Sequence, residues 1–364
     1  MFNLRKFSPR TFDWWLFVSA VLLVALGLAA IYSIDLSRGS TLTYFKKQAL
    51  AAGIGITLLL FISMFQHTVW RYSAKWWYGA SLVILTAVLI FGKTIRGTTG
   101  WFTMAGFSFQ PVEVAKVSIV LMLAAIIARF GSEFKRPLFF FGTGIFTFLL
   151  FALVMMQPDL GSALLLGMVW FGLMWLVGAR KLYMGLFIAI VLVIGTLGWM
   201  FFMEDYQRAR IATFINPEKD PLGSGYNITQ SIIAVGAGKW FGRGLGFGSQ
   251  SQLRFLPEAQ TDFIFSVIAE ELGLAGVVVL LTLFGVLFFR LLSLAAEAKD
   301  SFHAAAISGA LVLIFSQFFI NIGAGIGILP ITGVTLPFVS YGGSSLVMSM
   351  AFIGIIESMI ARRY

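Results

Sequence analysis

Cysteine is absent from the 364 residues, and histidine occurs only twice, as His67 and His303. The chain therefore forms no disulfide and has no thiolate ligand or cysteine nucleophile, and two histidines make a histidine-based metal site an unpromising hypothesis. Charged residues are also scarce, at 12%, whereas hydrophobic residues make up 59% and the mean hydropathy is +0.91. This composition predicts a polytopic membrane protein in place of soluble domains.

Apolar stretches long enough to cross a hydrocarbon core of about 30 Å recur along the chain. They lie at 14–34, 49–65, 76–91, 111–128, 138–156, 162–177, 182–202, 263–290, 304–327 and 346–361. The first stretch is longer than a signal-peptide core and another follows closely, so we expect a retained helix. The sequence thus predicts an all-α membrane protein of about ten helices, forming a single unit over 1–364.

The distribution of Lys and Arg between the short loops predicts the orientation. One side carries Arg5, Lys6, Arg10, Arg71, Lys75, Arg129, Lys135, Arg136, Arg180, Lys181, Arg290, Lys299, Arg362 and Arg363, whereas the other carries only Arg38, Lys46, Lys47, Lys93 and Arg96. The richer side is cytoplasmic by the positive-inside rule, and an even number of helices places both termini there. The long segment 203–262 between the seventh and eighth helices is then extracytoplasmic.

The net charge of +10 would suit a nucleic-acid-binding protein, but the basic residues lie in membrane loops, where they meet anionic headgroups. We therefore expect membrane lipids as partners and no nucleic acid. The unusual polar segments, at 92–110, 157–161, 203–262 and 328–345, are all extracytoplasmic in this topology. The cytoplasmic loops contain no nucleotide motif, so any chemistry is expected outside, where ATP and nucleotide sugars are absent.

The longest polar segment returns to an apolar stretch at Thr261 and Asp262, with Glu258 just before and Glu270 and Glu271 about two helical turns beyond. Carboxylates at or below a membrane surface are costly to keep and are often functional. A carboxylate at a helix N-terminus stays ionised and can accept a proton, although Asp262 or Thr261 could equally cap the helix. We interpret Asp262 as a general base and the other four residues as its support.

A second group of polar residues surrounds the start of the fourth helix and includes Arg96. Glu113 and Lys116 lie three residues apart on one face of that helix. Glu113 could equally be a helix-start acid that a neighbouring Lys neutralises. Lys116 lies further inside, where it cannot stay unpaired, so we expect it to face an anionic substrate or to pair with Glu270 or Glu271.

Three further segments contribute candidates. Asp159 lies in a hairpin between two apolar stretches, where it could bind substrate or cap the sixth helix. The segment 328–345, which contains Pro337, is too short to span and too apolar for a solvated loop, so we expect it to fold into the protein and line a cavity, although packing alone would also explain it. The loop 203–262 supplies basic residues, and a short re-entrant or interfacial helix is expected near 226–238.

Taken together, these motifs are Arg96-Gly97 with Trp101; Gln110-Pro111 with Glu113 and Lys116; Gln157-Pro158-Asp159-Leu160-Gly161; Leu256-Pro257-Glu258-Ala259 with Thr261-Asp262-Phe263-Ile264-Phe265; and Leu336-Pro337-Phe338 with Ser340-Tyr341-Gly342-Gly343-Ser344. In this order they resemble the SEDS family of FtsW, RodA and the sporulation homologue, over nearly the whole chain. One departure is Gln260, where many members have His.

The resemblance implies a multi-pass peptidoglycan glycosyltransferase of the bacterial inner membrane, active in cell elongation or division. It would polymerise lipid II with inversion and release undecaprenyl diphosphate, beside a class B penicillin-binding protein. Asp262 matches the family's essential acid, and Arg96, Lys116, Asp159 and Ser340 to Ser344 match positions important for activity.

The substrate-binding candidates are Arg96, Glu113, Lys116, Asp159, Arg208, Arg210, Gln230, Arg243, Ser340, Gly342, Gly343 and Ser344. No cofactor or protein-bound metal is expected, although a requirement for a divalent cation stays open. Two other functions also remain open from the residues themselves. A flippase for the same lipid would use charged groups within the helices, and a non-catalytic scaffold for cell-wall enzymes would tolerate loss of Asp262.

Overall fold

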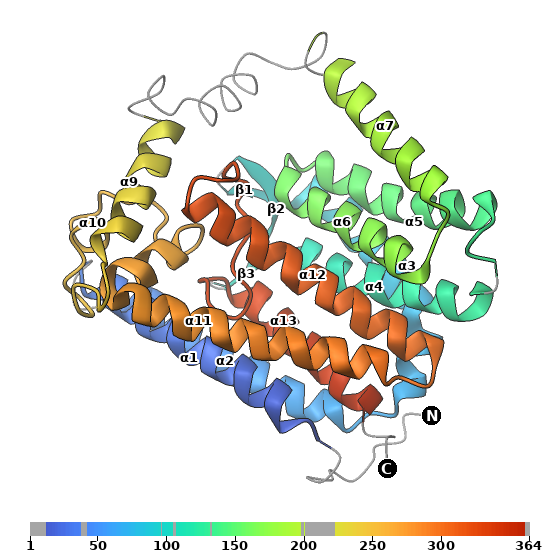
Figure 1. Ribbon diagram of the computed structural model, residues 1–364, viewed down its shortest axis with the longest axis horizontal. Coiled ribbons are helices and arrows are strands. Elements are labelled where there is room, and N and C mark those ends of the chain that lie inside the picture. Colours follow the sequence, from blue (N-terminus) through green and yellow to red (C-terminus); the bar gives the residue numbers. More distant parts are fainter. Residues whose placement is uncertain are drawn as a thin grey trace.

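The computed structural model describes residues 12–37, 42–95, 97–104, 107–131, 133–197, 200 and 223–360. Its long helices are α1 (Trp14–Leu36), α2 (Thr43–Ser63), α3 (His67–Phe91), α4 (Pro111–Phe130), α5 (Pro137–Met155), α6 (Leu160–Val177), α7 (Lys181–Leu197), α11 (Ile264–Ala296), α12 (Ser301–Gly325) and α13 (Gly343–Ile360). Two shorter helices, α9 (Ser224–Ala237) and α10 (Ser249–Gln252), lie between α7 and α11 (Figure 1).

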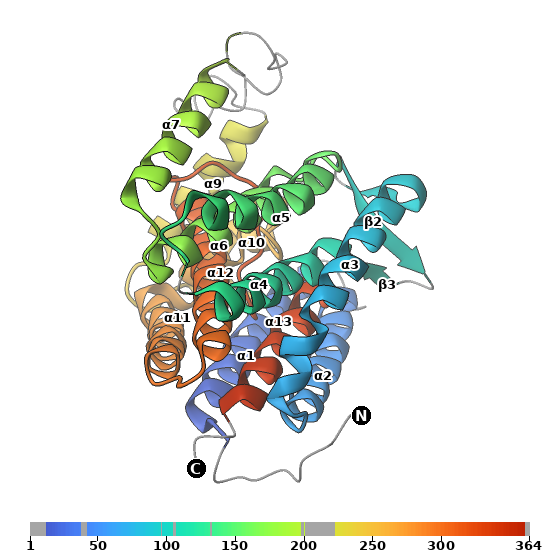
Figure 2. The same ribbon diagram turned by 90° about the vertical axis from the view of Figure 1, so that its right-hand side faces the viewer.

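Nine of these described helices are long and apolar enough to cross a bilayer. The tenth, α7, is also apolar but has only 17 residues, about 26 Å of helix. Its first turns contact α5 and α6 through the rings of Tyr183 and Phe187, whereas its later residues stand away from the bundle, and Met184 is its one buried side chain (Figure 2). The prediction of a polytopic all-α membrane protein is confirmed, with α7 in the place of the stretch expected at 182–202.

Several helix boundaries differ from the predicted ones. α2 begins at Thr43 instead of 49, and α3 begins at His67 instead of 76. The apolar pattern missed these first turns because they carry polar residues such as Lys46 and Arg71, whose side chains are exposed. The helix expected near 226–238 is α9.

A small antiparallel sheet lies where only a polar loop was expected, between α3 and α4. Its strands are β1 (Lys93–Ile95), β2 (Thr98–Met104) and β3 (Phe107–Phe109), in the order β1-β2-β3. Thr98 pairs with Ile95 and Phe102 with Phe109, so the chain turns back twice before α4. Strands this short carry too few alternating residues to stand out in the sequence.

α4 lies at the centre of the bundle, in contact with α3, α5, α6, α12 and α13. α1, α2, α11 and α13 form a second group beside it (Figure 2). Close packing between helices in lipid depends on small residues, because burial of apolar surface drives little association there. The contact of α13 with α2 is an example, since a Cβ atom added at Gly354 would lie 2.7 Å from the carbonyl oxygen of Leu59.

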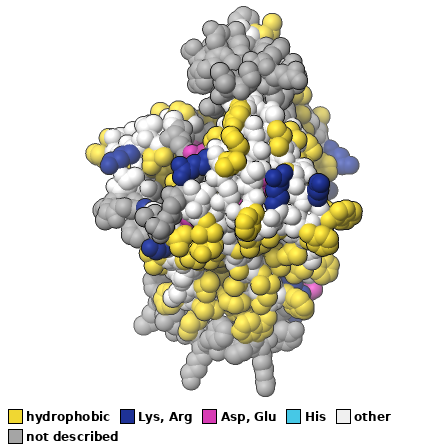
Figure 3. All heavy atoms as spheres, turned by 90° about the vertical axis from the view of Figure 1, so that its left-hand side faces the viewer, with side chains coloured by type: hydrophobic (Ala, Val, Ile, Leu, Met, Phe, Trp, Pro, Cys, Tyr) yellow, Lys and Arg dark blue, Asp and Glu magenta, His cyan; other side chains and the backbone are white. Residues whose placement is uncertain are grey.

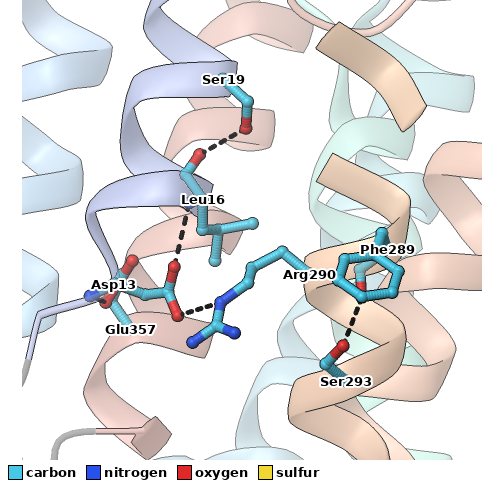
Figure 4. A network of polar contacts seen from close by, with 7 residues as sticks. All are labelled: Asp13, Leu16, Ser19, Phe289, Arg290, Ser293 and Glu357. Atoms are coloured by element: carbon cyan, nitrogen blue, oxygen red, sulfur yellow. Dashed lines mark hydrogen bonds and ion pairs between the residues drawn. The ribbon is translucent and has the colours of Figure 1, made fainter. Parts of the chain in front are cut away.

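Both ends of the described chain meet at one end of the bundle. The carboxylate of Asp13 accepts hydrogen bonds from the backbone N–H of Leu16, at 3.1 Å, and from Nε of Arg290, at 2.6 Å. The backbone N–H of Asp13 in turn donates to Glu357 at 3.1 Å (Figure 4). Because α1 starts on the side where α13 ends, the chain crosses the membrane an even number of times, which requires α7 as a tenth span.

This network should contribute measurably to stability. Arg290→Gln leaves the buried carboxylates of Asp13 and Glu357 together without the cation, so we expect a lower thermal unfolding midpoint for the purified protein. The matched control is Arg136→Gln in the exposed Arg136–Glu133 pair, worth no more than about 1 kcal/mol. Equal midpoints for the two variants would contradict this account.

Candidate active site

The residues just before α11 fold into a compact turn, residues 258–262. The carbonyl oxygen of Glu258 accepts the backbone N–H groups of Thr261, at 3.0 Å, and of Asp262, at 3.2 Å. Glu258 itself has a φ of 53°, a strained value for a residue with a side chain. The turn places Asp262, half-buried, two residues before the first residue of α11.

The alternative role of Asp262 or Thr261 as the helix cap is wrong for this structure. The N-cap residue of α11 is Phe263, whose side chain forms no capping hydrogen bond. The hydroxyl of Thr261 instead donates back to the carbonyl of Glu258 at 3.2 Å. Neither Asp262 nor Thr261 is therefore the N-cap residue of α11.

The segment between α12 and α13, residues 326–342, folds into the bundle as expected. Val334, Leu336 and Phe338 on it are buried. Two glycines permit its close approach to neighbouring helices. A Cβ atom at Gly27 would lie 2.3 Å from the carbonyl oxygen of Val339, and one at Gly161 would lie 2.3 Å from that of Thr332. The expected cavity-lining role of this segment stays a prediction.

The 326–342 segment binds directly to the 258–262 turn. The hydroxyl of Ser340 donates to the carbonyl of Thr261 at 2.7 Å and accepts the backbone N–H of Leu336 at 2.9 Å. The backbone N–H of Tyr341 donates to the carbonyl of Gln260 at 2.8 Å. The structure thus brings Ser340 beside Asp262 but engages its hydroxyl internally, so its assigned contact with substrate stays a prediction.

Three more candidates lie at the end of this segment and the start of α13. The backbone N–H of Gly342 donates to Oε1 of Gln48 at 3.1 Å. Gly343 is the first residue of α13, and Ser344 follows it, half-buried. Pro337 is buried within the segment, and its supporting role stays a prediction.

Lys116 pairs with Glu113 within α4, not with Glu270 or Glu271. Its Nζ lies 2.8 Å from Oε1 of Glu113, and only 4% of Lys116 and 6% of Glu113 are exposed. The expectation of a pairing with Glu270 or Glu271 is therefore corrected. A neighbour three residues away reaches the ammonium group with less reorganisation than a carboxylate on another helix.

Glu270 and Glu271 hold the outer loop against α11. Glu270 accepts the backbone N–H groups of Gln250, at 2.8 Å, and Ser251, at 3.2 Å. Glu271 accepts the hydroxyls of Ser33, at 2.6 Å, and Ser251, at 3.0 Å. Their contacts are those of supporting residues, and both are fully buried.

Asp159 uses both of its carboxylate oxygens in contacts within the protein. One carboxylate oxygen caps α6 by accepting the backbone N–H of Ser162 at 2.9 Å, as its alternative role predicted. The other accepts the side-chain amide of Gln110 at 3.1 Å. A role in binding substrate stays a prediction.

The structure describes only some of the remaining candidates, which are four arginines and Gln230. Arg243 is exposed and donates to the hydroxyl of Ser249 at 3.1 Å. Gln230 is half-buried on α9. Arg96, Arg208 and Arg210 lie outside the residues that the structure describes.

The face that carries this site is basic. Figure 3 looks at the end of the molecule with α9 and α10, where Lys and Arg side chains lie among apolar ones. The exposed basic residues of the described part of this side are Lys46, Lys47, Lys93, Lys239, Arg243 and Arg254. The described acids there are all buried or half-buried: Asp35, Glu113, Asp159, Glu258, Asp262, Glu270 and Glu271. Such a surface attracts anionic groups.

Two functional candidates were missed by the sequence reasoning. Gln48 and Asn321 are buried amides in the apolar helices α2 and α12, and both contact the segments around Asp262. A polar side chain inside a spanning helix was the available signal. In the ranges that the structure describes, no three His, Cys, Asp or Glu residues are placed to hold a metal ion.

Fold and site together define a polytopic membrane protein whose candidate site residues lie on one face, around the half-buried carboxylate of Asp262. Comparison with known proteins narrows this class. Residues 13–364 match the family of cell cycle proteins that comprises FtsW, RodA and SpoVE. The chain belongs to this family, and the resemblance inferred from its motifs is confirmed.

Individual relatives cover almost the whole chain. The peptidoglycan glycosyltransferase MrdB of Escherichia coli K12 is 37% identical over 346 residues, which are 94% of this chain and 92% of MrdB. The stage V sporulation protein E of Bacillus subtilis is 35% identical, with 97% of each chain covered.

Solved structures share the fold. A chain from a peptidoglycan synthase complex, in which polymerisation and crosslinking are coordinated, has a TM-score of 0.83 and 32% identity, covering 97% of this chain and 98% of its own. The rod shape determining protein RodA of Thermus thermophilus has a TM-score of 0.70 and 29% identity, with the same coverage.

Proposed function

We propose that this chain is a peptidoglycan glycosyltransferase of the bacterial inner membrane that polymerises lipid II at its outer face, with Asp262 as general base. The observation that carries the proposal is the position of Asp262. It lies half-buried in a braced turn at the outer end of α11, in a chain whose relatives are named for this activity.

The reaction is an inverting displacement at the anomeric carbon of the donor lipid. The hydroxyl of the acceptor sugar forms the new glycosidic bond and gives its proton to the Asp262 carboxylate. The bond from the anomeric carbon to the phosphate oxygen breaks, and undecaprenyl diphosphate leaves with the electron pair. A positioned base of this kind typically contributes about 10²–10⁴-fold to the rate.

The departing diphosphate requires nearby positive charge, because negative charge develops on it in the transition state. Arg243 is exposed on the outer loop, and the basic outer face supports binding of a diphosphate lipid. We assign Arg96 to the same role from its motif, and Arg208 and Arg210 because the predicted topology places the loop 203–262 on the outer side of the membrane. Lys116 would act as part of its ion pair, so its net charge is offset by Glu113.

A class B penicillin-binding protein is the proposed partner, cross-linking the strands as they are made. The solved complex that coordinates polymerisation with crosslinking supports this proposal, because one of its chains shares the fold of this one over nearly its whole length. The exposed apolar side chains of α11 and α12, such as Phe289 and Phe319, offer surface for another membrane helix.

The proposed function is tested with purified protein in liposomes that contain labelled lipid II, with the proposed partner present and absent. We expect glycan strands to form and undecaprenyl diphosphate to be released. Transfer of lipid II between leaflets without any polymer would identify a flippase instead. If neither polymer nor transfer is detected with a folded protein and its partner, the chain is a scaffold and the proposal is wrong.

A further inference from the structure

Asp262 is held through its backbone by a side chain from another helix. The amide nitrogen of Asn321, on the last full turns of α12, donates to the carbonyl of Asp262 at 3.1 Å and to the carbonyl of Val334 at 2.9 Å. Asn321 is 2% exposed. A single buried amide thus joins the reacting turn to the 326–342 segment.

The chemistry of the contact fixes how this amide is oriented. Only the NH₂ group of Asn321 can donate to two carbonyl oxygens at once, so the oxygen Oδ1 must point away from both. Oδ1 is buried, and it forms no hydrogen bond with any of the residues that the structure describes. A side chain that leaves one buried acceptor unsatisfied in order to bind two carbonyls is specialised for that contact, because such an atom is costly.

The two carbonyls before that of Asp262 are bound in the same way. Tyr341 donates its backbone N–H to the carbonyl of Gln260, and Ser340 donates its hydroxyl to the carbonyl of Thr261. Three successive peptide groups of the turn are therefore anchored from outside the turn, and each anchor comes from the chain between α12 and α13 or from the end of α12 itself.

A second buried amide, that of Gln48, holds the segment that carries Ser340 and Tyr341 in place. Gln48, on the second turn of α2, donates from Nε2 to the carbonyl of Ser340 at 3.0 Å and accepts the backbone N–H of Gly342 at 3.1 Å. It is 2% exposed. These paired contacts fix the position of Ser340 relative to α2, which packs along α13. Because Ser340 binds the carbonyl of Thr261, they also fix the position of Thr261.

We propose that Asn321 and Gln48 are positioning residues that set the location of the Asp262 carboxylate relative to the acceptor sugar. This inference rests on the proposed function of Asp262 as base. A carboxylate that accepts a proton must lie within hydrogen-bond reach of the attacking hydroxyl, and a displacement of 1 Å can cost about 10²-fold in rate. The strained turn has little regular structure of its own to supply that precision, so the external anchors supply it.

The test compares Asn321→Ala with Ser358→Ala. The control likewise removes a buried hydrogen bond, here from Nε1 of Trp70 at 2.8 Å, but at the end of α13 remote from the site. We expect Asn321→Ala to lower kcat for lipid II polymerisation by about 10²-fold with KM changed less than about threefold. Ser358→Ala should leave kcat near that of the unsubstituted protein.

A double-substitution cycle separates positioning from loss of structure. Asp262→Glu displaces the carboxylate by one methylene, and its penalty should shrink at least about tenfold in the Asn321→Ala background, because the turn no longer imposes one geometry. In the Ser358→Ala background the penalty should be unchanged. Should Asn321→Ala fail to fold, Gln48→Glu, which retains the acceptor for Gly342, takes its place in the same cycle.

Each outcome has one meaning. The positioning role would be overturned if the effects of Asp262→Glu and of the amide substitution multiply independently. It would also be overturned if the amide substitution alone leaves kcat unchanged. Either result would leave Asp262 as the base. Full activity of Asp262→Glu and Asp262→Ala in the otherwise unsubstituted protein would instead overturn the proposed function.

Discussion

Asp262→Ala is expected to lower the rate of lipid II polymerisation by about 10²–10⁴-fold, the range that a positioned general base contributes. The substitution removes a half-buried carboxylate from a residue that is not the N-cap of α11, and the backbone hydrogen bonds that hold the turn remain available to alanine, so we expect the variant to fold. The measurement is the steady-state rate of glycan synthesis by purified protein with its partner, normalised to the amount of folded protein.

A matched control is available on the opposite face of the membrane. Asp300 precedes α12 and caps it, accepting the backbone N–H of Phe302 at 2.8 Å, so Asp300→Ala removes the same side chain from the start of another span. We expect that variant to be less stable yet to polymerise lipid II when folded. A polymerisation rate within about twofold for Asp262→Ala would rule out the base, because even weak general base catalysis exceeds that.

The second large effect is expected at the buried ion pair of α4. Lys116→Met leaves the carboxylate of Glu113 buried without its partner, which typically costs about 3–5 kcal/mol. We therefore expect little folded Lys116→Met protein, measured as the monodisperse fraction after extraction. Glu113→Gln with Lys116→Met removes both charges and should restore the folded fraction.

The double variant also separates the two roles assigned to Lys116. If the ammonium group of Lys116 stabilises the leaving diphosphate, the folded double variant should still polymerise lipid II slowly despite its restored stability. A double variant with the full rate would make the pair purely structural. A stable, active Lys116→Met protein would contradict the burial argument itself.

The membrane architecture was predictable because each span is a long apolar stretch, and its length is dictated by the bilayer. The position of Asp262 at the outer start of a span followed from the same pattern. So did the folded-in segment before α13, because a stretch such as Leu336-Pro337-Phe338 fits neither lipid nor water. These are local features, readable from neighbouring residues.

What the sequence could not predict were contacts between distant positions. Asn321 meets the residue 59 positions before it, and Gln48 meets Ser340 across 292 positions. The pair of Lys116 and Glu113 differs from these contacts, because its spacing of three residues on one helix face was visible in the sequence, whereas the pairing expected with Glu270 or Glu271 was a long-range one. Spacing along the chain gives no ranking among distant partners once several lie on the same side of the membrane.

The most direct measurement is the equilibrium affinity of the Asp262→Asn protein for lipid II, made on the same preparation that is assayed for polymerisation. Asparagine keeps the size of the side chain and loses its ability to accept a proton. The account predicts a Kd within about threefold of the unsubstituted value, together with a rate lower by at least about 10²-fold. A loss of affinity that explains the whole loss of rate would contradict it, and so would undiminished synthesis of glycan.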